Sequence, residues 1–166
     1  MNIKQLWAPW RMEYLGGVRE KKKDVCVFCA LPGEADDRNN LIVHRGKSNF
    51  VILNRFPYNS GHVMVVPFQH TNKLHELSPD TMLEMMQLIR RSTEALGHAY
   101  KAEGFNVGMN LGLAGGAGIQ DHLHMHIVPR WVGDTNFMPI IAETKAMPQH
   151  LLTTFDSILE GFRRTA

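Results

Sequence analysis

The 166-residue chain has only two cysteines, a net charge of only +2 and no long hydrophobic run. Two cysteines are too few for the disulfide framework of a small secreted domain. The near balance of charge gives no strong field to attract nucleic acid or a membrane surface. No apolar stretch approaches the roughly 20 residues that span a bilayer, and the first residues lack the apolar core of a signal peptide. We therefore expect a cytoplasmic protein that binds neither nucleic acid nor membrane.

The composition is that of an ordinary globular protein, with 44% apolar and 20% charged residues, and the length fits one domain. Residues 1–24 are rich in aromatic and charged side chains without a clean period, and we interpret them as an N-terminal extension. Short apolar runs bounded by turn residues predict strands. Four of them fall near residues 41–44, 50–54, 62–67 and 105–111.

Two amphipathic helices are predicted from apolar residues at helical spacing. Ser78 can cap the first helix, and Pro79 suits its first turn. Met82 and Met86 are expected on its buried face, so we interpret these methionines as core residues. The face continues through Ile89, Thr93, Leu96 and Tyr100. A C-terminal helix is marked by Leu151, Leu152, Phe155, Ile158, Leu159 and Phe162. The order of elements predicts an α+β fold, with an antiparallel sheet covered by helices.

The most informative stretch, residues 122–126, reads His-Leu-His-Met-His. Strict alternation is the period of a β-strand, in which residues i, i+2 and i+4 project from one face. We therefore expect His122, His124 and His126 side by side, with Leu123 and Met125 on the opposite, buried face. A row of imidazoles offers metal ligands, a nucleophile or a proton shuttle near neutral pH.

Cys26 and Cys29 form a C-x-x-C pair, which can chelate one metal ion from a tight turn. Two more ligands are needed, and His70 and His122 are candidates because each stands next to a predicted strand. A Cys2His2 site from these four residues would be closed and therefore structural. The alternative is a reduced thiol pair without metal. A thioredoxin-like redox pair is disfavoured, because this segment does not open a helix after a strand.

A glycine-dense loop at residues 112–118 directly precedes the histidines. Exposed backbone N–H groups of such a loop suit phosphate binding. The loop matches neither the dinucleotide-binding glycine motif nor a Walker loop with its lysine, and a plain turn is the alternative. Its position before three aligned histidines favours the phosphate interpretation.

These residues together resemble a known family. The run His122–Arg130 resembles the signature of the histidine-triad (HIT) superfamily of nucleotide hydrolases and transferases. Residues 50–54, residues 61–67 and His70 resemble its central hairpin, and residues 26–29 resemble the start of its zinc-bearing members. The similarity covers roughly residues 25 to 137. Residues 6–15 and 131–137 resemble the bacterial branch related to diadenosine tetraphosphate phosphorylases, also described as ATP adenylyltransferases.

The resemblance implies a role for each histidine of the row. His124 aligns with the nucleophile that takes the nucleotidyl group as a covalent phosphoimidazole. His126 aligns with a phosphate-contacting histidine, and His62 with a histidine that orients the row. His122 aligns with a supporting histidine or, in members with a C-x-x-C pair, with a zinc ligand. The implied zinc ligands are then Cys26, Cys29, His70 and His122.

The resemblance also implies substrate contacts. Asn54 aligns with the ribose-hydroxyl contact and Asn110 with a polar residue near the α-phosphate. The apolar walls of the base pocket align with Phe28, Phe50 and Leu53. Trp131 can stack on a base or pack beside a strand end. Many members have Gln, Ser or Thr three or four residues before the first histidine of the row. This chain departs from that pattern with Gly118 and Ile119, so Gln120 or the backbone N–H groups of the glycine loop are expected to meet the leaving phosphate.

The resemblance implies a HIT catalytic domain over residues 25–137, with residues 138–166 as a C-terminal helical segment that packs on it. It implies a homodimer in which two sheets join into one, and a structural Zn2+. A catalytic metal in the site is not required, although Mg2+ bound to the nucleotide is compatible.

Three functions stay open. The first is phosphorolysis or hydrolysis of diadenosine polyphosphates through a nucleotidyl-histidine. The second is hydrolysis of nucleoside phosphoramidates. The third is a nucleotide-binding regulator without catalysis.

Overall fold

The computed structural model describes residues 25–134 and 149–165. The predicted N-terminal extension at residues 1–24 lies outside the described residues, as does the stretch 135–148. The strands are β1 (Ile42–Arg45), β2 (Asn49–Leu53), β3 (Val63–Pro67), β4 (Gly104–Met109) and β5 (Met125–Arg130). The α-helices are α2 (Val27–Ala30), α3 (Pro79–Tyr100) and α5 (Leu151–Arg164), with short 3-10 turns η1 (Leu31–Gly33) and η2 (Leu74–Glu76).

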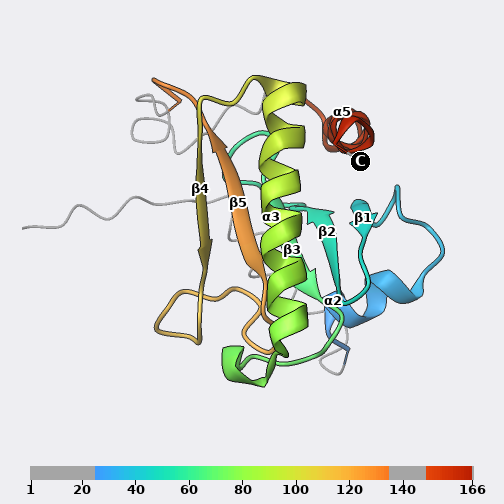
Figure 1. The fold of residues 1–166 in the computed structure, drawn as a ribbon, viewed down its shortest axis with the longest axis vertical. Helices are drawn as coiled ribbons and strands as arrows, with labels where there is room; N and C mark the ends of the chain where they lie inside the picture. The colour runs from blue at the N-terminus through green and yellow to red at the C-terminus, as the bar shows by residue number, and fades with distance from the viewer. Residues whose placement is uncertain (1–24, 135–148, 166) are drawn as a thin grey trace, which may run out of the picture.

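The five strands form one antiparallel sheet in the order β1-β2-β3-β5-β4. The long helix α3 runs across one face of the sheet, and α5 lies beside the C-terminal half of α3 (Figure 1). β2 and β3 are buried at every position, so the core is centred on them. This architecture confirms the predicted α+β class. The predicted domain boundaries and the sheet joined across a homodimer stay predictions. No helix in the described ranges is long and apolar enough to cross a membrane.

The histidine row departs from the predicted strand. β5 begins at Met125, so the prediction of a strand through the whole row is wrong for His122 and His124. Only His126 lies within the sheet, where it pairs with Met64 of β3. The side chains of His122 and His124 are nevertheless buried. The row is therefore an extended segment that enters a strand at its last histidine.

The reason for this late start lies in the end of β3. Pro67 has no N–H group and cannot extend the hydrogen-bond ladder toward His122. Instead, the Pro67 carbonyl accepts a hydrogen bond from the His122 ring, with Nε2 and O 2.8 Å apart. The next N–H group, that of Leu123, donates to the carbonyl of Thr71 over 2.8 Å. The Leu123 backbone is thus hydrogen-bonded to the loop after β3 rather than to β3 itself.

The buried face of α3 is also shifted from the predicted one. Met82 is 37% exposed and Met86 is 59% exposed, so their interpretation as core residues is wrong, whereas Met85 is buried. The Glu84 carboxylate explains the rotation, because it accepts hydrogen bonds from the backbone N–H groups of Lys47 and Ser48 at 2.6 and 2.7 Å. This contact turns the neighbouring Met85 inward. The buried positions of the helix are Thr81, Met85, Leu88, Ile89, Ser92, Ala95 and Leu96.

The predicted C-terminal helix is confirmed as α5, which buries Phe155, Ile158 and Phe162 and leaves Leu152 exposed. The helix packs tightly against α3 at Gly161. A Cβ atom on Gly161 would lie 2.5 Å from the carbonyl oxygen of Ala95, closer than such atoms can approach. Glycine at this position therefore lets the two helices pack against each other.

Two glycine substitutions should separate this packing contact from helix propensity. Gly97 lies in α3 with no atom within 4 Å of its would-be Cβ, so Gly97→Ala should stabilise the protein by up to about 1 kcal/mol. Gly161→Ala brings the same gain in propensity but forces the helices apart, at a cost of roughly 1–3 kcal/mol. Chemical unfolding of both variants measures the difference. An unfolding free energy of Gly161→Ala at or above that of the wild type would contradict the close approach.

Candidate active site and metal cluster

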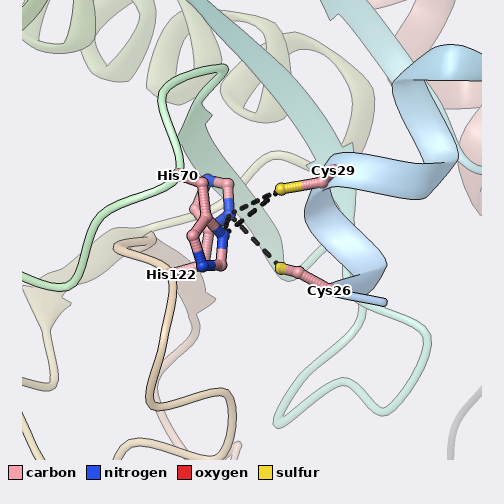
Figure 2. Close-up of side chains that lie close together, drawn as sticks. All are labelled: Cys26, Cys29, His70 and His122. Carbon is pink, nitrogen blue, oxygen red and sulfur yellow. Dashed lines mark hydrogen bonds between the residues drawn. The ribbon is translucent and has the colours of Figure 1, made fainter. Parts of the chain in front are cut away.

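Four side chains from three separate segments of the chain meet beside α2. Cys26 directly precedes α2 and Cys29 lies within it, while His70 follows β3 and His122 precedes β5. One ligand atom from each of the four lies within 4.8 Å of the others. In Figure 2 the two sulfur atoms and the two rings point toward a common centre. The structure thus brings together the four residues that were predicted as metal ligands.

Four of the six distances among these atoms fit a tetrahedral metal ion. The His122 Nδ1 atom lies 3.4 Å from the Cys26 sulfur and 3.6 Å from the Cys29 sulfur. The His70 Nδ1 atom lies 3.3 Å from the Cys29 sulfur and 3.3 Å from His122 Nδ1. For tetrahedral zinc with bonds of about 2.3 Å to sulfur and about 2.0 Å to nitrogen, these edges should measure roughly 3.3–3.6 Å.

The chemistry of the donors fits as well. The Pro67 carbonyl can only accept, so His122 carries its hydrogen on Nε2 and turns the Nδ1 lone pair toward the sulfurs. Burial lowers the pKa of His122, which keeps this ring neutral. Burial, followed by the neighbouring Cys26, raises the pKa of the Cys29 thiol. A cation at the common centre would favour the thiolate and reverse this effect.

His124 has one ring nitrogen fixed by the backbone. Its Nδ1 lies 2.9 Å from the carbonyl oxygen of His122, which can only accept, so Nδ1 carries the hydrogen. Burial lowers the pKa of His124, whose side chain is only 4% exposed. The neutral ring therefore has its lone pair on Nε2. The ring of Phe28 packs against it, with the ring centroids 5.3 Å apart.

His126 has the opposite tautomer, set by a relay of two hydrogen bonds. The backbone N–H of Tyr58 donates to His62 Nδ1 over 3.0 Å, so neutral His62 carries its hydrogen on Nε2. His62 Nε2 lies 2.9 Å from His126 Nδ1 and donates to it. Neutral His126 therefore carries its own hydrogen on Nε2. His62 is completely buried, which protects the relay from water.

The two neighbouring rings thus differ at the same atom. The rings of His124 and His126 lie 4.9 Å apart between centroids, nearly perpendicular at 80°. Nε2 of His124 has a lone pair that can attack an electrophile, and Nε2 of His126 has a hydrogen that can be donated to an anion. A neutral imidazole nucleophile beside a fixed hydrogen-bond donor is suited to group transfer at phosphorus.

Asn110 lies at the same end of the sheet as His124. It directly follows β4, whose last residue, Met109, pairs with Met125 at the start of β5. Its side-chain amide donates to the carbonyl of Gly116 over 3.3 Å and so holds the glycine loop. The predicted phosphate contacts, Asn110 and the loop, are therefore connected to each other at the start of β5.

Asn54 follows β2 and lies against the relay. Its side-chain nitrogen is 3.3 Å from His62 Nδ1, and its side-chain oxygen accepts from the Phe56 N–H over 2.9 Å. The backbone N–H of Asn54 donates to the carbonyl of His62. The predicted ribose contact thus lies next to the histidine that orients the row.

The predicted base-pocket residues on β2 face opposite sides of the sheet. Ile52 pairs with Met64, which pairs in turn with His126, so these three side chains share a face. Phe50 lies two residues before Ile52 and projects from the same face. Leu53 projects from the other face, so the structure does not bring it to the histidines.

The remaining predicted contacts lie farther from the relay. Gly118 and Gln120 are exposed in the turn before the histidine row. Trp131 follows the far end of β5, roughly 20 Å along the strand from His124 at about 3.3 Å per residue. Its indole N–H donates to the carbonyl of Tyr100 over 3.3 Å. Within one chain, Trp131 therefore packs against the end of α3 rather than beside the nucleophile candidate.

Sequence reasoning missed Tyr58. Its backbone N–H starts the relay, and its ring stacks on His62 with centroids 4.8 Å apart. The Pro-Tyr-Asn-Ser-Gly stretch at residues 57–61 has the composition of a turn, and no pattern marks a backbone donor. Only the position of this turn beside His62 shows its role.

Comparisons with known proteins agree with this geometry. The HIT domain profile matches residues 36–132. AP-4-A phosphorylase of Mycobacterium tuberculosis is 37% identical over 159 residues, which cover 92% of this chain and 81% of that protein. Adenosine 5'-monophosphoramidase of Schizosaccharomyces pombe is 30% identical over 105 residues, covering 63% of this chain and 74% of that protein. A Zn-bound histidine triad family protein of Mycobacterium smegmatis has a TM-score of 0.67 at 25% identity, covering 84% of this chain and 94% of that one.

The chain belongs to the HIT family. This confirms the resemblance seen in the sequence and the prediction that the chain is an enzyme of that family.

The metal cluster makes a direct prediction. Purified protein should contain about one zinc ion per chain by elemental analysis. Cys26→Ser should lose most of this zinc and lower the free energy of unfolding by several kcal/mol, because a bound ion would tie α2 to two distant loops. His75→Ala is a matched control, since His75 lies in an exposed 3-10 turn near His70 and outside the cluster. Equal zinc content in Cys26→Ser and wild type would contradict this assignment.

Proposed function

We propose that this chain cleaves diadenosine polyphosphates by transferring a nucleotidyl group first to His124 and then to phosphate or water. The observation that carries the proposal is the placement of two adjacent rings: Nδ1 of His124 lies against a carbonyl oxygen, and Nδ1 of His126 lies against Nε2 of His62. The name of the 37% identical mycobacterial relative, AP-4-A phosphorylase, supports this choice of substrate.

In the first step, the Nε2 lone pair of His124 attacks the α-phosphorus of the substrate. The bond from phosphorus to the bridging oxygen breaks, and a nucleoside polyphosphate leaves. The Nε2 hydrogen of His126, the Asn110 amide and N–H groups of the glycine loop meet the charge that develops on the phosphoryl oxygens. Electrostatic stabilisation of this kind is usually the largest single contribution to such a rate.

In the second step, phosphate or water attacks the phosphorus of the adenylyl-imidazole, and the bond to His124 Nε2 breaks. Diadenosine tetraphosphate would then give ATP and ADP with phosphate, or ATP and AMP with water. Forming a covalent intermediate divides one difficult displacement into two easier ones.

The surrounding residues are proposed to hold the substrate. Asn54 would bind the ribose hydroxyls, while Phe28 and Phe50 would form apolar walls for the base. Gln120 and the backbone at Gly118 would contact the leaving phosphates from the exposed turn. Mg2+ would enter only with the nucleotide: among the described residues, the one group of three or more potential ligands is the cysteine–histidine cluster, whose sulfur and imidazole donors do not suit Mg2+.

Zn2+ is proposed to bind Cys26, Cys29, His70 and His122 as a structural ion. When bound, it would supply positive charge that stabilises the two thiolates. The name of the M. smegmatis structure, a Zn-bound histidine triad family protein, supports this assignment. A homodimer is proposed to form through β4, because this strand lies at the edge of the sheet and Val107 in its middle is 45% exposed.

A phosphoramidate is the second candidate substrate. The 30% identical S. pombe relative is named adenosine 5'-monophosphoramidase, and attack by His124 on a P–N bond would use the same two rings. A regulator without catalysis is the third possibility. It is disfavoured because a mere binding site does not need a lone pair on His124 Nε2 beside a hydrogen on His126 Nε2.

One product assay tests the proposal. Diadenosine tetraphosphate incubated with the protein should give ADP and ATP if phosphate is the acceptor, or AMP and ATP without added phosphate if water is. His124→Asn should lower the rate by at least about 10³-fold, while leaving the unfolding transition in place. His98→Asn, on the exposed side of α3, should keep the wild-type rate. The wild type, quenched during turnover, should contain an adenylyl group on His124 by peptide mass spectrometry.

Three results would decide against it. A His124→Asn rate near that of the wild type removes His124 from the nucleophile role. Turnover of adenosine phosphoramidate alone favours the second candidate. Binding of nucleotide without any product favours the regulator.

A further inference from the structure

The hydrogen-bond relay that sets the His126 tautomer starts in the loop between β2 and β3, which is not part of the sheet. The Tyr58 N–H donates to His62 over 3.0 Å, and the Tyr58 ring lies 27° from parallel to the His62 ring. The same ring lies 5.9 Å from that of His126 between centroids. Both contacts come from residues 57–61, which are bends and turns between β2 and β3. Whatever fixes this loop also fixes the hydrogen on His126.

Asn59 anchors the loop to the far end of β5. Its side-chain amide donates to the carbonyl of Pro129 over 3.0 Å and to Oδ2 of Asp134 over 2.9 Å. Its own carbonyl accepts from the backbone N–H of His62 over 3.1 Å. Asn59 is only 7% exposed, so water does not compete strongly for these bonds. One side chain thus connects the relay to the end of a strand.

The Asp134 carboxylate, which accepts from this amide, is held in place by other hydrogen bonds. Its carboxylate accepts two hydrogen bonds from Arg130, at 2.6 Å from Nε and 2.7 Å from Nη2. It also accepts from the backbone N–H of Trp131 over 3.2 Å. The Asp134 side chain is 9% exposed, and a carboxylate with a two-pronged arginine partner is held in a single orientation. The Asn59 amide therefore donates to a carboxylate with a fixed orientation.

We propose that Asn59 and Asp134 are positioning residues that act through Tyr58 and His62 to keep the Nε2 hydrogen on His126. This inference rests on the proposed function, because it assigns His126 the donor role at the phosphoryl group. The Asn59–Asp134 contact holds the loop at the distance at which the Tyr58 N–H reaches His62. Without it, the Tyr58 N–H moves away and leaves the longer contact from the Asn54 side-chain amide, 3.3 Å from His62 Nδ1, to hold the tautomer in which His62 donates to His126.

The geometry distinguishes this role from simple packing. A residue that only stabilised the fold would lower the unfolding temperature and leave the ring nitrogens unchanged. A positioning residue changes the hydrogen on His62 and His126 but not on His124, since the His124 tautomer is set separately by the His122 carbonyl. The His124 ring is thus an internal reference for the rings of His62 and His126.

Two variants of the full chain test the proposal. Asn59→Leu removes both donated hydrogen bonds at similar volume, and Asn59→Asp keeps the shape but presents a carboxylate to Asp134. Glu103→Ala is the matched control, because exposed Glu103 accepts from the Val132 N–H in the same turn without touching the Asp134 carboxylate. Protein labelled with nitrogen-15 at histidine reports the tautomer of each ring by NMR.

We expect a single Nε2–H tautomer at His62 and His126 in the wild type and in the control. Both Asn59 variants should show mixed tautomers at these two rings, with His124 unchanged. Their kcat for diadenosine tetraphosphate should fall about 10- to 100-fold with KM preserved, because the donor is misplaced while ground-state contacts stay.

Two outcomes overturn the proposal: unchanged tautomers at His62 and His126 in both variants, whatever their rate, or mixed tautomers with the full rate. The proposed function can fail separately from this inference. If the wild type turns over neither a diadenosine polyphosphate nor a phosphoramidate, the proposed function is wrong. The NMR tautomers alone then decide whether Asn59 positions His126.

Discussion

The hydrogen bond from His124 to the carbonyl of His122 is the contact on which the rest of the site depends. His122 is held from two further sides, because its Nε2 donates to the Pro67 carbonyl and its Nδ1 faces the sulfurs of the cysteine pair. Its ring and its carbonyl belong to one residue, so a shift of the ring moves the acceptor of His124. The position of the lone pair on His124 Nε2 therefore depends on how firmly the cysteine–histidine cluster holds His122.

Peptide groups rather than charged side chains define the chemistry of the two adjacent rings. A carbonyl cannot donate and an N–H cannot accept, so the His122 carbonyl and the Tyr58 N–H set opposite tautomers at His124 and His126. Neither group titrates near neutral pH, which makes the assignment independent of neighbouring carboxylates. Dipoles fixed before the substrate arrives need no reorganisation during the reaction, and this is the basis of electrostatic catalysis.

The sequence predicts the parts of this site that depend on period and spacing. The alternation at residues 122–126 indicates that the histidines gather, and the C-x-x-C pair indicates the cluster with His70. Contacts made by backbone groups leave no such mark. The stretch around Tyr58 has the composition of a turn, and nothing in it shows which N–H reaches His62. Helix phase is hidden for a related reason, since Met82 and Met85 are equally apolar and only the contact of Glu84 with a distant turn chooses between them.

The late start of β5 at Met125 is what leaves the His124 ring a backbone acceptor. In a regular ladder, the carbonyl of His122 would be directed toward a neighbouring strand, as the carbonyls in the paired part of β5 are. Pro67 ends the ladder on β3, and the Leu123 N–H turns to the carbonyl of Thr71 instead. β4 ends at Met109, before any residue that would pair with His122, so the His122 carbonyl is available to the ring two residues ahead of it. A histidine triplet that continued the strand throughout would align the same three rings but would lose the acceptor that puts the lone pair on His124 Nε2.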